Sequence, residues 1–182
     1  APLLNRHLGE QPAFAPDNLV KLLTRVKPGY IRVEADEVTY PAHVMLRFEI
    51  ERRLIEGSMQ VEDIPSAWNA QMQQLLGLST EGNFKDGCMQ DVHWPDGLFG
   101  YFPCYTLGAM YAAQFFAAMR RERPDLDACI GRGELSAVFD WLKDRVWSQG
   151  SLWETPDLVR RASGETLNPA HFQAHLRARY LG

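Results

Sequence analysis

The sequence is poor in cysteine: its 182 residues include only Cys88, Cys104 and Cys129, an odd number with no C-x-x-C spacing. This pattern argues against a zinc ribbon, a dithiol redox motif and a disulfide framework, and we expect reduced thiols in a cytoplasmic protein. The sequence has no run of about 18 apolar residues, so we expect no transmembrane helix and no membrane partner. Its first residues lack both an initiating Met and the pattern of a signal peptide, which predicts a piece of a longer protein.

Positive charge is not in excess either. The formal net charge is -4, and the one basic run, at residues 120–123, falls at the end of a helical pattern, where it complements the helix dipole. Without a basic stripe we expect no nucleic-acid partner. A composition of 46% hydrophobic and 23% charged residues is that of an ordinary soluble globular protein, and the length suffices for one self-contained domain.

Strand-like alternation is missing, whereas helical periodicity recurs along the chain, so the sequence predicts an all-α fold in one helical unit over residues 1–182. Prolines that directly follow cap residues, at positions 156 and 169, predict the starts of two short terminal helices. The other helices are expected over residues 17–26, 35–56, 64–76 (ended by Gly77), 105–119 and 134–147.

Three of these helices carry burial predictions. Residues 105–119 are apolar on most sides, which predicts a helix buried against several neighbours, and residues 134–147 carry an amphipathic stripe. Within residues 35–56, one set of apolar side chains recurs at helical intervals and predicts the core-facing stripe, whereas a charged set is expected to face solvent. The apolar set is Val38, Met45, Phe48 and Ile55, and the charged set is Glu49, Glu51, Arg52 and Arg53.

Two segments look like neither ordinary core nor ordinary surface. The first, residues 31–40, reads I-R-V-E-A-D-E-V-T-Y and crowds ionisable groups beside apolar ones. If it is helical, Arg32 and Asp36 lie one turn apart and can pair. A solvated ion pair at a helix start remains the plain alternative to a functional site.

The second segment, residues 87–105, reads G-C-M-Q-D-V-H-W-P-D-G-L-F-G-Y-F-P-C-Y. Its Gln, Asp, His and Tyr side chains precede the most apolar expected helix, and polar groups in such a place are either fully hydrogen-bonded or functional. The residue types leave both readings open for His93. The aromatic residues Trp94, Phe99 and Phe102 are expected to pack rather than to bind a ligand.

These two segments resemble the I-R-x-x-A-D and G-x-x-Q-D-x-H-W signatures of the carboxypeptidase Taq metallopeptidase family. The stretches L-R-F-E-I-E, F-G-Y-F-P-C-Y and A-A-Q-F-F follow the same family's order and spacing, so the resemblance covers essentially the whole chain and corresponds to the family's C-terminal part. Two signatures in register are far more specific than one short motif.

The resemblance implies a zincin-type, neurolysin-like helical fold and a peptide hydrolase that removes single residues from peptide C-termini. The family's enzymes hold zinc or cobalt with two His of an H-E-x-x-H helix and a Glu of a following helix. This sequence contains no H-E-x-x-H, and its only His pair at i,i+4 spacing, His171 and His175, has Phe172 in place of the catalytic Glu. We therefore expect no metal ligand in this chain, an absent N-terminal half that carries all three ligands, and no activity of this segment alone.

The resemblance also assigns roles to individual residues. Arg32 matches the Arg of the first signature, and a guanidinium is suited to bind the terminal carboxylate of a peptide. Asp36 is expected to orient Arg32 or to support the local turn. His93 matches the His of the second signature, and it is expected to donate a hydrogen bond to the same carboxylate or to the tetrahedral oxyanion.

Four further residues complete the expected site. Gln90 and Asp91 of the second signature are expected to hold the loop and the tautomer of His93. Tyr101 and Tyr105 follow His93 by 8 and 12 residues, and related helical zinc peptidases place a Tyr at comparable spacing to stabilise the oxyanion. On that ground Tyr101 is the expected catalytic tyrosine and Tyr105 an expected substrate-binding residue.

Two other interpretations stay open beside a segment of a metallocarboxypeptidase. The chain could be a non-catalytic helical binding module derived from the family, or a second chain could supply the metal-binding half. Under each interpretation we expect helices whose apolar faces lack their usual cover, hence a large apolar patch or self-association. The family resemblance independently implies a homodimer.

Overall fold

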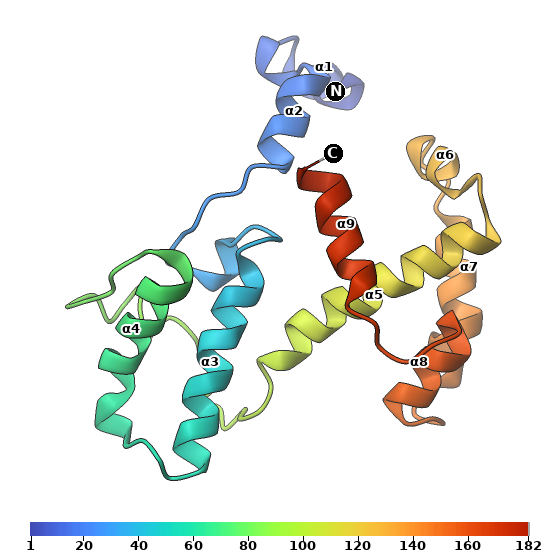
Figure 1. The fold of residues 1–182 in the computed structure, drawn as a ribbon. Helices are drawn as coiled ribbons and strands as arrows, with labels where there is room; N and C mark the ends of the chain where they lie inside the picture. Colours follow the sequence, from blue (N-terminus) through green and yellow to red (C-terminus); the bar gives the residue numbers. More distant parts are fainter. Residues whose placement is uncertain (182) are drawn as a thin grey trace. The chain divides into compact units, whose positions relative to one another are not determined.

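In a computed structural model that describes residues 1–181, the contacts within the chain form two compact units. The first unit runs from Ala1 to Pro103, and the second begins at Cys104 (Figure 1). The described residues contain α-helices and short 3-10 turns and no strand, so the all-α prediction is confirmed. None of the described helices is both long and apolar enough to cross a membrane.

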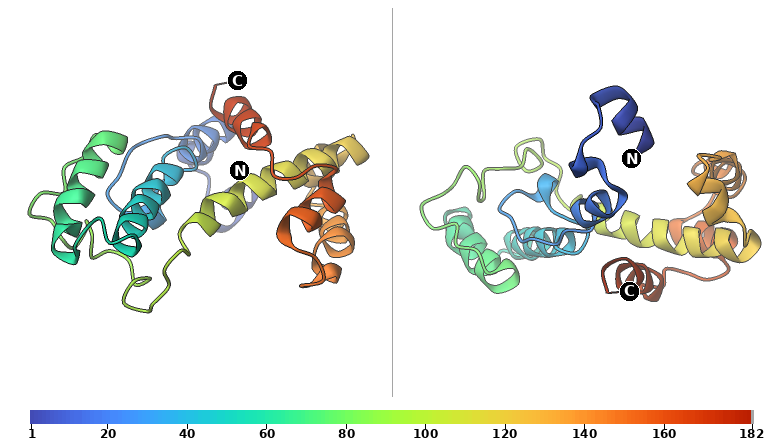
Figure 2. Two further views of the ribbon diagram at one scale, coloured as in Figure 1. Left: turned by 60° about the horizontal axis from the view of Figure 1, so that its bottom comes forward. Right: turned by 90° about the horizontal axis from the view of Figure 1, so that it is seen from above.

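The first unit holds four α-helices and then a long loop that reaches residue 102. α3 and α4 run side by side in every view (Figures 1 and 2). A 3-10 turn at Arg32–Glu34 precedes α3, and another at Val61–Asp63 joins α3 to α4. The helices are α1 (Pro2–Leu8), α2 (Pro16–Leu23), α3 (Tyr40–Ile55) and α4 (Ile64–Leu76).

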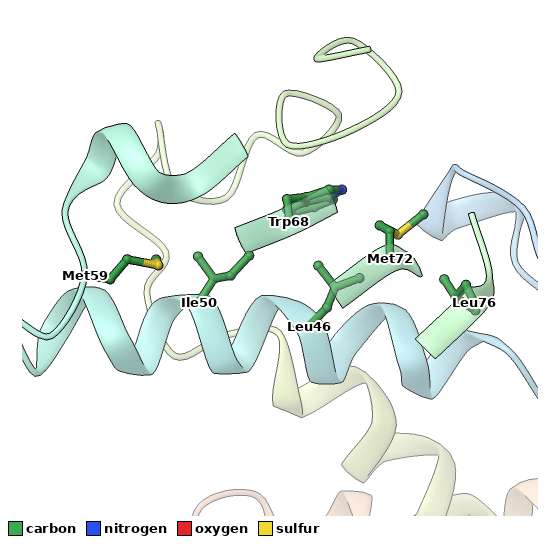
Figure 3. Close-up of a cluster of buried hydrophobic side chains, with 6 residues drawn as sticks. All are labelled: Leu46, Ile50, Met59, Trp68, Met72 and Leu76. Carbon is green, nitrogen blue, oxygen red and sulfur yellow. The ribbon is translucent and has the colours of Figure 1, made fainter. Parts of the chain in front are cut away.

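The core of the first unit lies between α3 and α4 (Figure 3). Burial of each large apolar side chain there contributes about 1.5–3 kcal/mol. α4 begins with Pro65 in its first turn and ends at Gly77, whose φ of 69° is the left-handed conformation that glycine adopts without strain, as the sequence predicted. The core side chains are Leu46, Ile50, Met59, Trp68, Met72 and Leu76.

The apolar stripe predicted for α3 was wrong. Met45, Phe48 and Ile55 are 58%, 47% and 72% exposed, and Val38 lies outside the helix and is also exposed. Glu51, expected in solvent, is buried. The positions of the apolar residues predicted the wrong buried face of α3, because the loop that follows α4 covers a polar face of this helix.

The second unit is built on α5, around whose C-terminal half α6, α7 and α8 gather (Figures 1 and 2). The side-chain amide of Gln114 on α5 donates to Ser163 Oγ at 2.8 Å and to the Thr166 carbonyl at 3.0 Å, and its Oε1 accepts from the main-chain N–H of Asn168 at 2.8 Å. This one side chain thereby fixes the connection between the last two helices. The helices are α5 (Pro103–Glu122), α6 (Leu126–Gly131), α7 (Ser136–Arg145), α8 (Thr155–Ser163) and α9 (Ala170–Tyr180).

Two burial predictions for the second unit also differ from the structure. On α5, expected to be buried on most sides, only Gln114, Ala118 and Met119 are buried among the described residues. On α7 no residue is buried, and Phe139 of its predicted stripe is 52% exposed. Both helices therefore carry apolar surface that the described residues of the second unit leave uncovered.

Candidate functional site

The two signature segments meet at the carboxylate of Asp91. Arg32 donates from Nε and Nη2 to Asp91 Oδ1 at 3.0 and 2.9 Å. From the opposite side, Arg47 donates from Nε to Asp91 Oδ2 at 2.6 Å. The side chains of all three residues are at most 11% exposed. One buried carboxylate is thus shared by two guanidinium groups.

Gln90 joins the backbones of the same two segments. Its Oε1 accepts from the main-chain N–H of Arg32 at 2.8 Å, and its Nε2 donates to the carbonyls of Tyr30 at 3.0 Å and Asp86 at 2.7 Å. Arg32 also donates from Nη1 to the hydroxyl of Tyr40 at 2.8 Å. The backbone and the side chain of Arg32 are therefore both held in place by neighbouring polar groups.

Asp36 supports the turn that leads into α3. Its Oδ1 accepts from the main-chain N–H groups of Val38 and Thr39 at 3.0 and 2.9 Å, and its Oδ2 accepts from that of Lys27 at 2.8 Å. Burial acts to raise the pKa of Asp36, but the hydrogen bonds from Lys27, Thr39 and Val38 outweigh it and lower that pKa. The sequence allowed Asp36 to pair with Arg32 if the segment were helical, but the 3-10 turn ends at Glu34, and Arg32 forms its ion pair with Asp91.

His93 lies beside this cluster and is 7% exposed. Its ring stacks at a tilt on Phe102 with a centroid distance of 4.3 Å, and the ring of Tyr101 is 5.8 Å away. The Nδ1 of His93 is 3.9 Å from Asp91 Oδ1, an electrostatic contact longer than a hydrogen bond. The structure therefore brings His93, Tyr101 and Asp91 together.

Glu51 anchors the loop that carries His93. Its Oε1 accepts from the indole N–H of Trp94 at 2.8 Å, and its Oε2 accepts from the main-chain N–H of Gly100 at 3.2 Å. Trp94 packs edge-on against Trp68 of the core and against Phe102. These contacts agree with the expectation that Trp94 and Phe102 pack.

Sequence reasoning gave no role to Arg47, which is 0% exposed on α3. Its guanidinium lies over the ring of Trp68 at 4.4 Å and donates from Nη1 to the carbonyl of His43 at 2.8 Å. A signal was present: Thr39, His43, Arg47 and Glu51 recur every fourth residue, and all four are buried. A polar stripe at helical spacing marks one face as clearly as an apolar stripe does.

The electrostatics of the cluster follow from burial and from the shared carboxylate. Burial acts to lower the pKa of Arg32, but its hydrogen bond and charge interaction with Asp91 raise it above the usual value. Burial lowers the pKa of Arg47 to about 10, with the charge of Arg32 acting in the same direction and Asp91 opposing it. Burial and the neighbouring Arg47 likewise lower the pKa of His43 to about 4, so both arginines are charged and His43 is neutral at pH 7.

The remaining predicted residues lie in the second unit. Tyr105 is on α5, and His171 and His175 are on α9. The Nε2 of His171 is 2.8 Å from Glu165 Oε1, and His175 stacks against Phe172. Within residues 1–181 no group of three or more His, Cys, Asp or Glu side chains is placed to hold a metal ion.

Comparison with known proteins gives the family. Residues 1–180 match the family described as Carboxypeptidase Taq (M32) metallopeptidase. Carboxypeptidase 1 of Bacillus subtilis is 42% identical over 164 residues, or 90% of this chain, and Thermostable carboxypeptidase 1 of Thermus thermophilus is 45% identical over 155 residues, or 85% of this chain. The solved structure of Trypanosoma cruzi metallocarboxypeptidase 1 superposes with a TM-score of 0.95 at 49% identity and covers 100% of this chain. The chain belongs to the carboxypeptidase Taq metallopeptidase family, which confirms the resemblance.

The chain spans only about a third of these relatives: 32% of the Bacillus protein, 30% of the Thermus protein and 38% of the Trypanosoma structure. Membership in a metallopeptidase family implies a metal cofactor. The donor set of the described residues does not fit one, because the polar cluster contains two arginines and a single carboxylate at its centre. What the cluster offers instead is fixed positive charge.

Proposed function

We propose that this chain supplies the substrate-carboxylate and oxyanion side of the cleft of a zinc-dependent metallocarboxypeptidase that removes single residues from peptide C-termini. Zinc, or cobalt, would be held by an N-terminal part that carries H-E-x-x-H. The supporting observation is the arrangement of Arg32: its guanidinium is fixed by Asp91 and Tyr40, and its backbone by Gln90. A guanidinium held in one orientation loses little entropy when it binds a carboxylate.

Arg32 and His93 are the proposed substrate-binding pair, and both lie at the Asp91 cluster. In this proposal Arg32 binds the terminal carboxylate, and His93 donates to that carboxylate or to the oxyanion. Tyr101, whose ring is 5.8 Å from that of His93, would donate to the oxyanion. Tyr105 would contact the substrate.

The proposed role of Arg32 is tested by Arg32→Ala and Arg32→Lys in the full-length protein that contains this chain. Loss of a charged anchor or oxyanion donor costs about 2–4 kcal/mol of transition-state binding, so kcat/KM for an N-blocked peptide should fall by about 30- to 1000-fold in Arg32→Ala. Arg32→Lys should recover part of the loss. Arg52→Ala, at an arginine whose side chain is 44% exposed, is the control and should leave kcat/KM unchanged. An unchanged kcat/KM in Arg32→Ala would refute the assignment.

We further propose that this chain alone is inactive, since its described residues hold no metal-binding group. The test compares metal content and peptide hydrolysis of the isolated chain and of the full-length protein. Stoichiometric zinc together with hydrolysis by the isolated chain would overturn the proposal. A homodimer and a cytoplasmic location belong to the same proposal, and the exposed Met45, Phe48 and Ile55 of α3 are the surface that we expect the full-length protein to cover.

A further inference from the structure

Arg47 is the most deeply buried charge of the first unit, and its burial has an electrostatic cost that nothing in the core requires. It is 0% exposed between the ring of Trp68 and the carboxylate of Asp91. Removing an arginine from water is expensive, and cores in which apolar residues replace buried ion pairs are often equally stable or more stable. An arginine in this position therefore calls for a reason other than packing.

Pairing with Asp91 does not supply that reason, because Arg32 already neutralises this carboxylate through two hydrogen bonds. Arg47 adds a second positive charge to a pair that is already balanced. The other buried carboxylate on the same face of α3, Glu51, accepts its hydrogen bonds from Trp94 and from the main chain of Gly100. Arg32, Arg47 and Asp91 hold two positive charges and one negative charge, and the buried carboxylate of Glu51, which accepts only from neutral N–H groups, balances their formal charge.

The two arginines also differ in their place around Asp91. Arg47 binds Oδ2 and Arg32 binds Oδ1, so Arg47 fixes the plane of the carboxylate from the side opposite to Arg32. Its own orientation is set by the carbonyl of His43 and by the Trp68 ring. A side chain that is held on both sides in this way also fixes the orientation of the group that it binds.

We propose that Arg47 is a positioning residue for the substrate carboxylate: it fixes Asp91, and through Asp91 it holds the guanidinium of Arg32 in the orientation that binds a free peptide C-terminus. The inference rests on the proposed function of Arg32. It adds that the preference for a carboxylate over an uncharged C-terminus depends on Arg47, which does not bind the substrate itself but contacts Arg32 through Asp91.

The test uses the full-length protein and two probes that differ only in charge, an N-acetylated amino acid and its C-terminal amide, as competing inhibitors of peptide hydrolysis. The ratio of their inhibition constants measures the preference for a carboxylate. In Arg47→Met this preference should fall by about 10- to 100-fold, the usual scale for a lost supporting contact, while kcat for the peptide changes less than KM. Arg47→Lys keeps the charge but not the planar fork, so it should retain part of the preference.

Met72→Ala is the control that distinguishes a positioning role of Arg47 from a purely structural one. It loosens the same α3–α4 core without touching Asp91. This control should lower the unfolding temperature and leave the preference for the acid unchanged. If Arg47 acts through Arg32, the double variant Arg32→Ala with Arg47→Met should prefer the acid no less than Arg32→Ala alone.

The inference is overturned if folded Arg47→Met, or folded Arg47→Lys should the first variant not fold, keeps the wild-type preference within about twofold, since that is within the scatter of such measurements. Additive losses in the double variant would equally exclude a role that passes through Arg32. If Arg32→Ala itself keeps the wild-type preference, the proposed function of Arg32 fails. If Arg32→Ala loses the preference and Arg47→Met does not, only the inference about Arg47 fails.

Discussion

Replacement of Asp91 by Asn removes the one negative charge between two buried guanidinium groups. The amide keeps the shape of the side chain and one acceptor oxygen, but it leaves the positive charges of Arg32 and Arg47 facing each other with no anion between them. Ion pairs with contact distances of 2.9 and 2.6 Å are lost at the same time. We therefore expect a loss of stability in the first unit, and not merely a local adjustment.

The magnitude follows from the burial of the partners. Breaking a buried ion pair by removal of one member costs about 3–5 kcal/mol, because the remaining charge is left uncompensated. Two charges are left in this case, while the retained oxygen of Asn offsets part of the cost, so we expect about 3 kcal/mol. A typical domain is stabilised by about 5–15 kcal/mol in total, so the expected loss is a large part of that stability.

Urea unfolding followed by circular dichroism, with amide exchange of α3 as a local probe, measures this loss. The matched control is Asp127→Asn, which removes a carboxylate from an exposed ion pair with Arg120 at 2.9 Å. Because exposed pairs contribute little, this control should unfold like the wild type. Addition of Arg47→Met to Asp91→Asn should recover stability, since it removes one of the two uncompensated charges. Equal stability of Asp91→Asn and Asp127→Asn would refute the reasoning.

Two further predictions concern other buried polar groups. Burial and the charge of Arg47 lower the pKa of His43 to about 4, from a usual value of 6.5 in the unfolded chain. Between pH 6.5 and pH 4 the unfolded state therefore binds more protons, so this contribution to stability is complete above pH 6.5 and should fall by about 3 kcal/mol as the pH drops to 4. In urea titrations at several pH values His43→Gln should flatten this dependence, whereas His7→Gln, at an exposed position, should not. Gln114→Leu should destabilise the second unit by about 1–3 kcal/mol in urea unfolding, because it leaves the main-chain N–H of Asn168 without its acceptor; exposed Gln173→Leu is the control, and equal values would contradict this account.

Local sequence signals predicted most of the helices. The end of α4 at Gly77 and the prolines that open α8 and α9 act through the backbone of a few neighbouring residues, so they do not depend on tertiary packing. The start of α3 was predicted five residues too early. The reason is visible in Asp36, whose carboxylate holds a turn before the helix instead of pairing along it.

The candidate site was predicted in part, and the limit is physical. The signature residues Arg32, Gln90, Asp91 and His93 were singled out, and the structure places them together in the first unit. Sequence spacing could not show that Arg32 pairs with a carboxylate 59 residues away instead of one four residues away. Long-range pairing is decided by the loop that folds back over α3, and no local pattern encodes its path.

Arg47 shows how site residues that were missed in this sequence could be found in other chains. The predicted apolar stripe of α3 is exposed, and the polar residues at positions 39, 43, 47 and 51 are buried. Buried polar groups must find partners within the protein, so a polar stripe of period four on a helix predicts that another segment rich in donors and acceptors covers it. In this chain that segment is the loop with Asp91, Trp94 and Gly100. This rule would have predicted that the second signature packs on α3 and that Arg47 is a candidate partner of Asp91.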